Sequence, residues 1–229
     1  MRLIRLAFAT AIALCLASGL AVAQRQQNQG QNNRQQQRAG AMVQNALDAV
    51  SAQSDPLLLI FRKDVQHDLQ MDLGQRNRFD NLHDRQALDL QQARTQNRRN
   101  RTAVTDLQAK QKKETQAKID ELLTDQQKTR LKQIVLQIQG NAALFSTDLQ
   151  KRLGMTTDQI QQVKQIKADR EQKITQLQAD ISQGNTTLQE ATLQIQDILT
   201  EANSSLGELL TDEQADQLKK LQGPPFKAG

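Results

Sequence analysis

Two blocks of sequence occur twice in this chain, in the same order and at similar separations. Segment 60–75 (IFRKDVQHDLQMDLGQ) returns 84 residues later as 144–159 (LFSTDLQKRLGMTTDQ), with Phe, Asp, Gln, Leu, Met and Gln at matching positions. Segment 121–127 (ELLTDQQ) returns as 208–214 (ELLTDEQ). Because two ordered matches rarely arise by chance, we expect a tandem duplication, with one unit in 42–140 and a second in 141–226.

Both recurring blocks contain the pattern of a helix N-terminal capping box. In this box the cap side chain accepts from the amide at N3, and a Gln at N3 reaches back to the cap amide. An apolar residue precedes each cap. The four boxes, each with its apolar residue, are Met71-Asp72-x-x-Gln75, Leu123-Thr124-x-x-Gln127, Met155-Thr156-x-x-Gln159 and Leu210-Thr211-x-x-Gln214. Helices are therefore expected to begin near residues 73, 125, 157 and 212.

Between the boxes the apolar residues recur at helical spacing, which predicts an all-α fold of elongated helical hairpins. Gly184-Asn185 predicts the turn of the second hairpin. The matching distance places the first turn near Asn100, where one continuous long helix is the alternative. Short helices are expected in 42–53 and 57–70, and Gly223-Pro224-Pro225 is expected to end the last helix.

The composition agrees with slender helices rather than with a thick core. Aromatic residues make up 2% of the chain and hydrophobic residues 37%, so a barrel, a doubly wound sheet or a large closed active site is not expected. The chain has two His and one Cys, and it has no Gly-rich phosphate loop or ordered Ser, His and Asp set. We therefore expect no enzymatic activity, no catalytic residue and no cofactor.

The segment 1–23 has the parts of a secretory signal peptide. Arg2 and Arg5 precede an apolar run over 6–22, and Ala21-Val22-Ala23 supplies the small residues for cleavage. A membrane anchor is the alternative, but the run is short for a span of about 20 residues. Export to the periplasm, or secretion, is expected. The only cysteine, Cys15, leaves with the signal, so we expect no disulfide in the mature chain.

The charge of the chain is unevenly distributed. Removal of the signal leaves 28 basic residues against 25 acidic ones, and the Gln/Asn/Arg-rich stretch 24–41, expected to be a disordered arm, carries Arg and no acid. The rest is neutral, which argues against a nucleic-acid partner. Segment 94–118 holds eight basic residues against two acidic ones, whereas 174–218 holds eight acidic residues and no Lys or Arg. These are either unrelated solvated faces or surfaces that pair within the chain or across a dimer.

The two complete boxes, Leu123-Thr124-x-x-Gln127 and Leu210-Thr211-x-x-Gln214, resemble the LTxxQ signature of the Spy/CpxP family of small exported helical proteins. The other two boxes depart from it, since Met155 replaces Leu in one and Asp72 replaces Thr in the other. The resemblance covers about 60–226 and implies two Spy/CpxP-like hairpin units in tandem. Family members dimerise into a curved cradle, which implies either a homodimer or an internal pseudo-dimer here.

The resemblance also implies a function. Family members act as ATP-independent periplasmic chaperones, as inhibitors of envelope-stress sensor kinases or as metal-responsive regulators. We expect a chaperone that binds unfolded clients, and the alternatives are a regulator that binds the periplasmic domain of a sensor kinase and a structural helical spacer. Candidate client-binding residues lie in two corresponding apolar runs, which the core would otherwise bury: Leu57, Leu58, Leu59, Ile60 and Phe61, and Leu144 and Phe145.

Two Asp-x-x-His-Asp sets, at 64–68 and 80–84, are the only metal-ligand pattern that we identify. Sixteen residues along a helix span about 24 Å, so the two sets cannot share one ion without a bend. Each set alone has too few ligands for zinc. No metal site is therefore expected, and His67 and His83 remain weak candidates.

Overall fold

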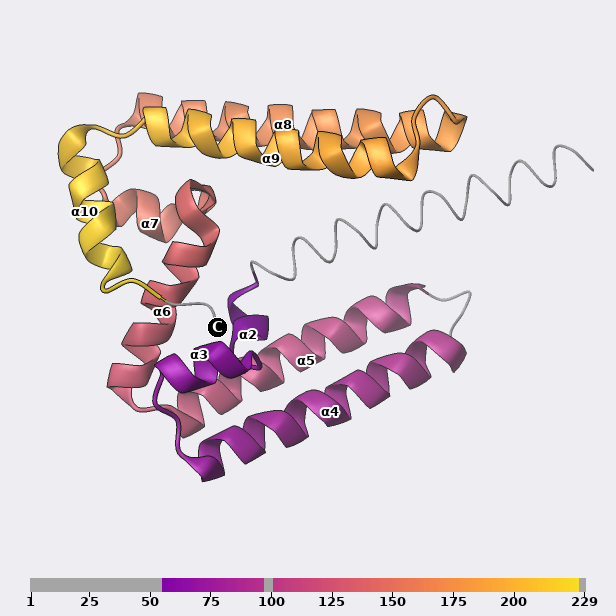
Figure 1. The fold of residues 1–229 in the computed structure, drawn as a ribbon, viewed down its shortest axis with the longest axis vertical. Helices are drawn as coiled ribbons and strands as arrows, with labels where there is room; N and C mark the ends of the chain where they lie inside the picture. Colours follow the sequence, from indigo (N-terminus) through magenta and orange to yellow (C-terminus); the bar gives the residue numbers. More distant parts are fainter. Residues whose placement is uncertain (1–54, 97–100, 227–229) are drawn as a thin grey trace, which may run out of the picture. The chain divides into compact units, whose positions relative to one another are not determined.

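The computed structural model describes residues 55–96 and 101–226 (Figure 1). Within these ranges the chain forms helices and no strand, which confirms the all-α prediction. The elements are α2 (Pro56–Leu59), α3 (Lys63–Asp68), α4 (Leu73–Gln96), α5 (Arg101–Leu122), α6 (Asp125–Gln139), the 3-10 helix η1 (Gly140–Phe145), α7 (Thr147–Arg152), α8 (Thr157–Gln183), α9 (Leu188–Glu208) and α10 (Asp212–Gln222). The predicted signal peptide, the arm, the helix at 42–53 and the turn near Asn100 lie outside these ranges.

The chain divides into two compact units. The tip unit contains the described segment Glu171–Asp197, and the main unit contains the described residues of Asp48–Arg170 and Ile198–Gly229. The boundary predicted between residues 140 and 141 lies inside the main unit, so the duplication itself stays a prediction. In the part of the chain that the structure describes, no helix combines the length and the apolar character that a membrane span requires.

Four helices begin where their capping boxes predict. The starts of α4, α6, α8 and α10 lie one residue after the caps Asp72, Thr124, Thr156 and Thr211. Both hydrogen bonds of the box are present at each cap, since the cap oxygen accepts from the amide at N3 and the N3 glutamine accepts from the cap amide. Local sequence alone therefore determines these starts.

The predicted single helix over 57–70 is wrong. The helix α2 begins at Pro56 and ends at Leu59, and α3 begins only after Arg62, whose backbone is extended. The carbonyl of Ile60 lies in the break, and the buried Gln66 amide donates to it at 3.2 Å. A buried polar group requires such a partner, and a helical apolar pattern does not reveal it.

The same arrangement recurs 84 residues later. The buried Gln150 amide donates to the carbonyl of Leu144 at 2.8 Å, as Gln66 does to Ile60. The end of the next helix also repeats. The amide of Met155 donates to the carbonyl of Gln150 at 3.0 Å, as the amide of Met71 does to the carbonyl of Gln66 at 3.1 Å. The recurring block thus has the same local structure at 60–75 and at 144–159.

The main unit contains two hydrophobic clusters. The first packs residues of α2 to α6 and includes Phe79 and Ile134, which are fully buried. The second packs η1, α7, the start of α8, the end of α9 and α10, and includes the fully buried Leu144 and Leu206. The helix α6 belongs to both, because its Ile134 lies in the first cluster and its Leu136 packs against the second. The helix α6 therefore lies between the two clusters and packs against both.

The helices α4 and α5 form an antiparallel hairpin (Figure 1). The Gln111 side chain donates to the carbonyl of Gln86 at 2.8 Å, and the Gln86 side chain donates to the Thr115 hydroxyl at 3.3 Å. Gln86 and Thr115 are both buried. These cross-helix bonds exclude the alternative of one continuous helix from α4 into α5.

The tip unit contains the end of α8 and the start of α9, joined by a turn at Gly184 as predicted. Gly184 has a φ of 78°, which favours glycine. Leu177 and Ile181 of α8 and Ala191 and Ile195 of α9 are buried. The helical spacing of these residues predicts this burial from sequence.

A further capping box, beyond the four predicted from the sequence, starts α9. The Thr187 hydroxyl accepts from the amide of Glu190 at 3.2 Å, and the Glu190 carboxylate accepts from the Thr187 amide at 2.8 Å. The bond from the Thr187 amide is the main reason that the pKa of Glu190 lies below its usual value. The ionised form of the Glu190 carboxylate is therefore the form that the hydrogen bonds at the start of α9 stabilise.

Candidate binding groove

The glutamines of the first two capping boxes bind each other across the base of the α4–α5 hairpin. Gln75 donates to the side-chain oxygen of Gln127 at 2.9 Å, and Gln127 donates back to Gln75 at 3.0 Å. Each amide also donates to a main-chain carbonyl, Gln75 to Leu122 at 2.7 Å and Gln127 to Leu69 at 3.2 Å. The pair therefore joins the segment that precedes α4 to the segment that follows α5.

The second pair of boxes has the same geometry. Gln159 donates to the side-chain oxygen of Gln214 at 2.7 Å, and Gln214 donates back at 3.1 Å. Gln159 also donates to the carbonyl of Leu209 at 2.7 Å. We call these four residues the paired glutamines, and their hydrogen bonds indicate an architectural role, since each satisfies main-chain groups at the end of a helix.

Sequence reasoning predicts the boxes but misses that their glutamines pair. The signal is present in the spacing, because the partners are 52 residues apart in the first pair and 55 in the second. When a hairpin has two helices of similar length, the box before its first helix and the box after its second helix lie at the same end of the hairpin. The four apolar residues that precede the boxes pack into the two hydrophobic clusters. Met71, Leu123 and Met155 are buried, and Leu210 is partly buried against the second cluster.

The candidate client-binding residues are mostly part of the core. Leu59, Ile60 and Leu144 are at most 1% exposed, so they do not form a surface in this conformation. The reason is that each run ends a short helix that packs directly onto a hydrophobic cluster. The remaining candidates are accessible to different degrees: Leu57, Phe61 and Phe145 are half-buried and Leu58 is 42% exposed.

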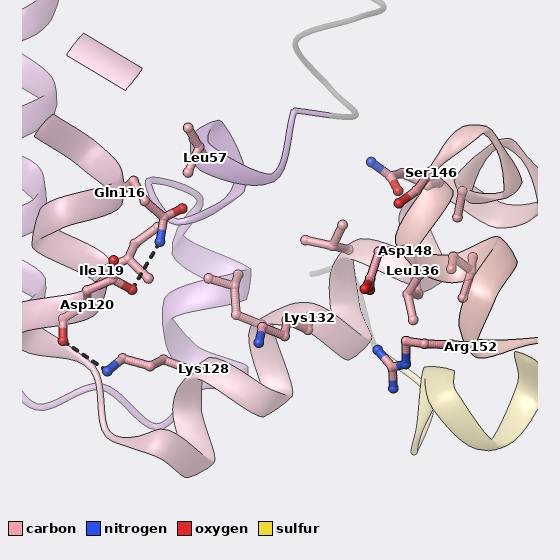
Figure 2. A pocket seen from close by; sticks show the side chains of 15 residues that line it. Leu57, Gln116, Ile119, Asp120, Lys128, Lys132, Leu136, Ser146, Asp148 and Arg152 are labelled. Atoms are coloured by element: carbon pink, nitrogen blue, oxygen red, sulfur yellow. Dashed lines mark hydrogen bonds between the residues drawn. The ribbon is translucent and has the colours of Figure 1, made fainter. Parts of the chain in front are cut away.

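The main unit has an open groove between α2 and α5 on one side and η1 and α7 on the other, with α6 as its floor (Figure 2). Its volume is about 520 Å³. Of the candidate residues, only Leu57 lines it. The other apolar lining residues are Ile119, Leu131, Val135, Leu136, Ala143 and Leu149.

The rim of this groove is charged. Figure 2 shows Asp120 receiving two bonds, from Gln116 to its carboxylate at 3.0 Å and from Lys128 to its carbonyl at 2.9 Å. Lys132 and Arg152 are exposed at other points of the rim. An apolar floor with charges of both signs around it suits a polypeptide segment better than a compact apolar ligand.

Sequence reasoning misses this groove, although α6 carries a signal for it. The apolar residues of α6 cover a wide face, because Ile134, Val135, Leu136 and Ile138 lie within five consecutive positions. A helix with so wide an apolar face contacts more than one neighbour or leaves part of the face open. Here Ile134 is buried, whereas Val135 and Leu136 are half-buried and line the groove.

The two His-containing sets do not form a cluster of ligands. Three of their four carboxylates pair with Lys or Arg: Asp64 with Arg62, Asp68 with Arg130 at 2.6 Å, and Asp80 with Lys63 at 2.6 Å. His67 is exposed, and His83 lies 3.4 Å from Asp84 and against the Phe61 ring. Among residues 55–96 and 101–226, no group of three potential metal ligands comes together.

The main unit therefore contains two pairs of capping boxes whose glutamines bind each other, and an amphipathic groove along α6. The resemblance to the Spy/CpxP family depends on the boxes and on their spacing. Comparison with known proteins finds no family model, no curated protein and no solved structure that matches this chain.

Proposed function

We propose that this protein is a non-enzymatic chaperone of the bacterial envelope, of the Spy/CpxP type, which binds unfolded proteins without ATP. The observation that carries the proposal is the groove, with its apolar lining of Leu57, Val135 and Leu136 and its charged rim. Unfolded clients expose apolar side chains next to main-chain amides and charges, and the groove offers complementary groups for each.

The size of the groove supports weak and reversible binding. Burying one client Leu or Phe side chain contributes about 1.5–3 kcal/mol. Association costs at least about 4 kcal/mol in lost freedom of motion, so a few such side chains are needed before binding becomes measurable. Rim charges such as Lys132 and Arg152 accelerate encounter more than they strengthen the complex. A holdase that must release its client benefits from this balance.

The test is suppression of aggregation by the mature chain, residues 24–229, without ATP. Two unrelated denatured clients are followed by light scattering, with an inert helical protein as the control. We expect protection of both clients at near-stoichiometric ratios. If neither is protected at several-fold excess, the chaperone proposal fails, and a regulator with one specific partner becomes the hypothesis to test.

A matched pair of variants then tests the groove itself. Val135 and Ile138 both lie on α6 and both pack, partly buried, against the first cluster, but only Val135 lines the groove. Val135→Ser is expected to reduce protection of both clients, whereas Ile138→Ser costs similar stability and leaves protection unchanged. Equal effects of the two variants would assign client binding to another surface.

A further inference from the structure

The segment that follows α10, Gly223-Pro224-Pro225-Phe226, is held on α6 by side chains that bind its main chain. Arg130 donates to the carbonyl of Pro224 at 2.7 Å, and Gln137 donates to the same carbonyl at 2.8 Å. Gln137 also donates to the carbonyl of Gln222 at 2.5 Å. Its side-chain oxygen in turn accepts from the Phe226 amide at 2.6 Å. Gln137 thus binds the segment at Pro224 and at Phe226, and it also binds Gln222, the last residue of α10.

Phe226 is the anchor of this segment. Its ring packs against the first hydrophobic cluster, whose residues are far from α10 in sequence. The Arg62 guanidinium lies 5.9 Å from the ring centroid. The two prolines before it are exposed. The segment is therefore held by one partly buried aromatic side chain and by the bonds that Arg130 and Gln137 make to its main chain.

The backbone of the segment is preset by its composition. Gly223 has a φ of 65°, which favours glycine, and a Cβ there would force the end of the Gln133 side chain to move. Each proline ring fixes its own φ, and Pro225 disfavours a helical conformation at Pro224. An extended conformation of this kind has a low entropy cost when it binds.

Of the two α6 side chains, Arg130 is positioned without help from the segment. Arg130 forms two hydrogen bonds with Asp68, at 2.6 and 3.0 Å, and is only 17% exposed. Because the segment contributes to no helix or sheet, it can leave without breaking any secondary structure. What would remain is an arginine and a glutamine that present donors, beside an open apolar seat.

We propose that Arg130, Gln137 and the seat of Phe226 form a peptide-recognition site, the α6 cradle, which the chain's own residues 223–226 occupy in competition with clients. The cradle selects an extended segment with a proline followed by an aromatic residue. Extended proline-containing segments with an exposed aromatic side chain are a feature of unfolded chains, so this inference rests on the proposed chaperone function and names a client class for it. Occupation by residues 223–226 keeps the seat covered until a client segment displaces them.

The experiment is a peptide titration on the mature chain. The probe is a fluorescently labelled peptide with the sequence Gln-Gly-Pro-Pro-Phe, and binding is followed by anisotropy. Phe226→Ala removes the anchor of the internal segment and leaves the cradle intact. A tethered segment competes at an effective concentration near the millimolar range, so we expect the peptide to bind Phe226→Ala at least about tenfold more tightly than the unaltered chain.

Controls separate recognition from a loss of fold. Circular dichroism and thermal unfolding check that Phe226→Ala is folded, and a second variant, Pro224→Gly with Pro225→Gly, loosens the segment while keeping its anchor and is expected to raise affinity by a smaller factor. Adding Gln137→Ala to Phe226→Ala is expected to abolish the gain, as is a peptide with Ser in place of Phe. If neither the folded Phe226→Ala chain nor the second variant binds the peptide more tightly than the unaltered chain, the inference is overturned.

Two further outcomes have distinct meanings. A concentration-dependent mass of the unaltered chain that disappears in Phe226→Ala would make a second copy the occupant, and it would overturn the assignment to clients. Light scattering reports on the proposed function separately. Protection of clients without peptide binding would overturn only the cradle, whereas peptide binding without protection would support the cradle and contradict the chaperone.

Discussion

Replacing one of the paired glutamines tests whether the capping boxes hold the fold together. Gln127→Ala removes four hydrogen bonds: two accepted, from the Thr124 amide and Gln75, and two donated, to Leu69 and Gln75. A net hydrogen bond contributes about 1 kcal/mol, and the bonds measure 2.9 to 3.2 Å, so we expect a loss of about 2–4 kcal/mol in the free energy of unfolding. Urea unfolding followed by circular dichroism measures it, with no change in the m-value.

The neighbouring residue supplies the control. Gln126 lies in the same box and is exposed, so Gln126→Ala is expected to change stability by no more than about 0.5 kcal/mol. A double-mutant cycle with Gln75→Ala isolates the contact between the two side chains. Because either single substitution removes both mutual bonds, the coupling energy is expected to be about 1–2 kcal/mol. A coupling energy near zero, or equal effects of Gln126→Ala and Gln127→Ala, would rule out this role for the paired glutamines.

Three further predictions concern stability. Thr211→Ala removes the cap of α10 and is expected to cost about 1 kcal/mol in thermal unfolding, with no change in helix content at room temperature. Gly223→Ala forces a side chain into a positive φ and against Gln133, and it is expected to cost about 1–3 kcal/mol in the same assay. The hydrogen bond from Arg62 lowers the pKa of Asp64 below its ordinary value of 3.8, so this stabilisation is complete at neutral pH and is lost as the pH falls below about 4. Arg62→Ala is expected to flatten the acid limb of a plot of unfolding free energy against pH, and an unchanged limb would contradict the ion pair.

The helix starts could be predicted because a capping box is a local device. Asp72, Thr124, Thr156 and Thr211 need only a glutamine three residues later, and the sequence displays both partners together. The turn at Gly184 and the end of α10 at Gly223 are local for the same reason, since each needs a positive φ. Elements specified by neighbours in sequence are therefore read correctly.

Features that depend on tertiary packing could not be predicted in this way. At the break between α2 and α3 the buried Gln66 side chain donates to the carbonyl of Ile60, while the apolar run Leu57–Phe61 suggests one continuous helix. Packing against residues distant in sequence buries Leu59 and Ile60, which sequence reasoning offered as a surface. Pairing of Gln75 with Gln127 depends on the register of the whole hairpin. The groove is assembled from five elements and so has no contiguous signature.

The most direct test of client binding in the groove is site-specific photo-crosslinking. A photoreactive residue replaces Lys132 on the groove rim in one variant and Lys219 of α10, which is exposed and does not line the groove, in another. Each mature chain is illuminated with two unrelated unfolded clients. We expect crosslinks to both clients from position 132 and none above background from position 219. Crosslinks of equal yield from the two positions, or none from position 132, would contradict client binding in the groove.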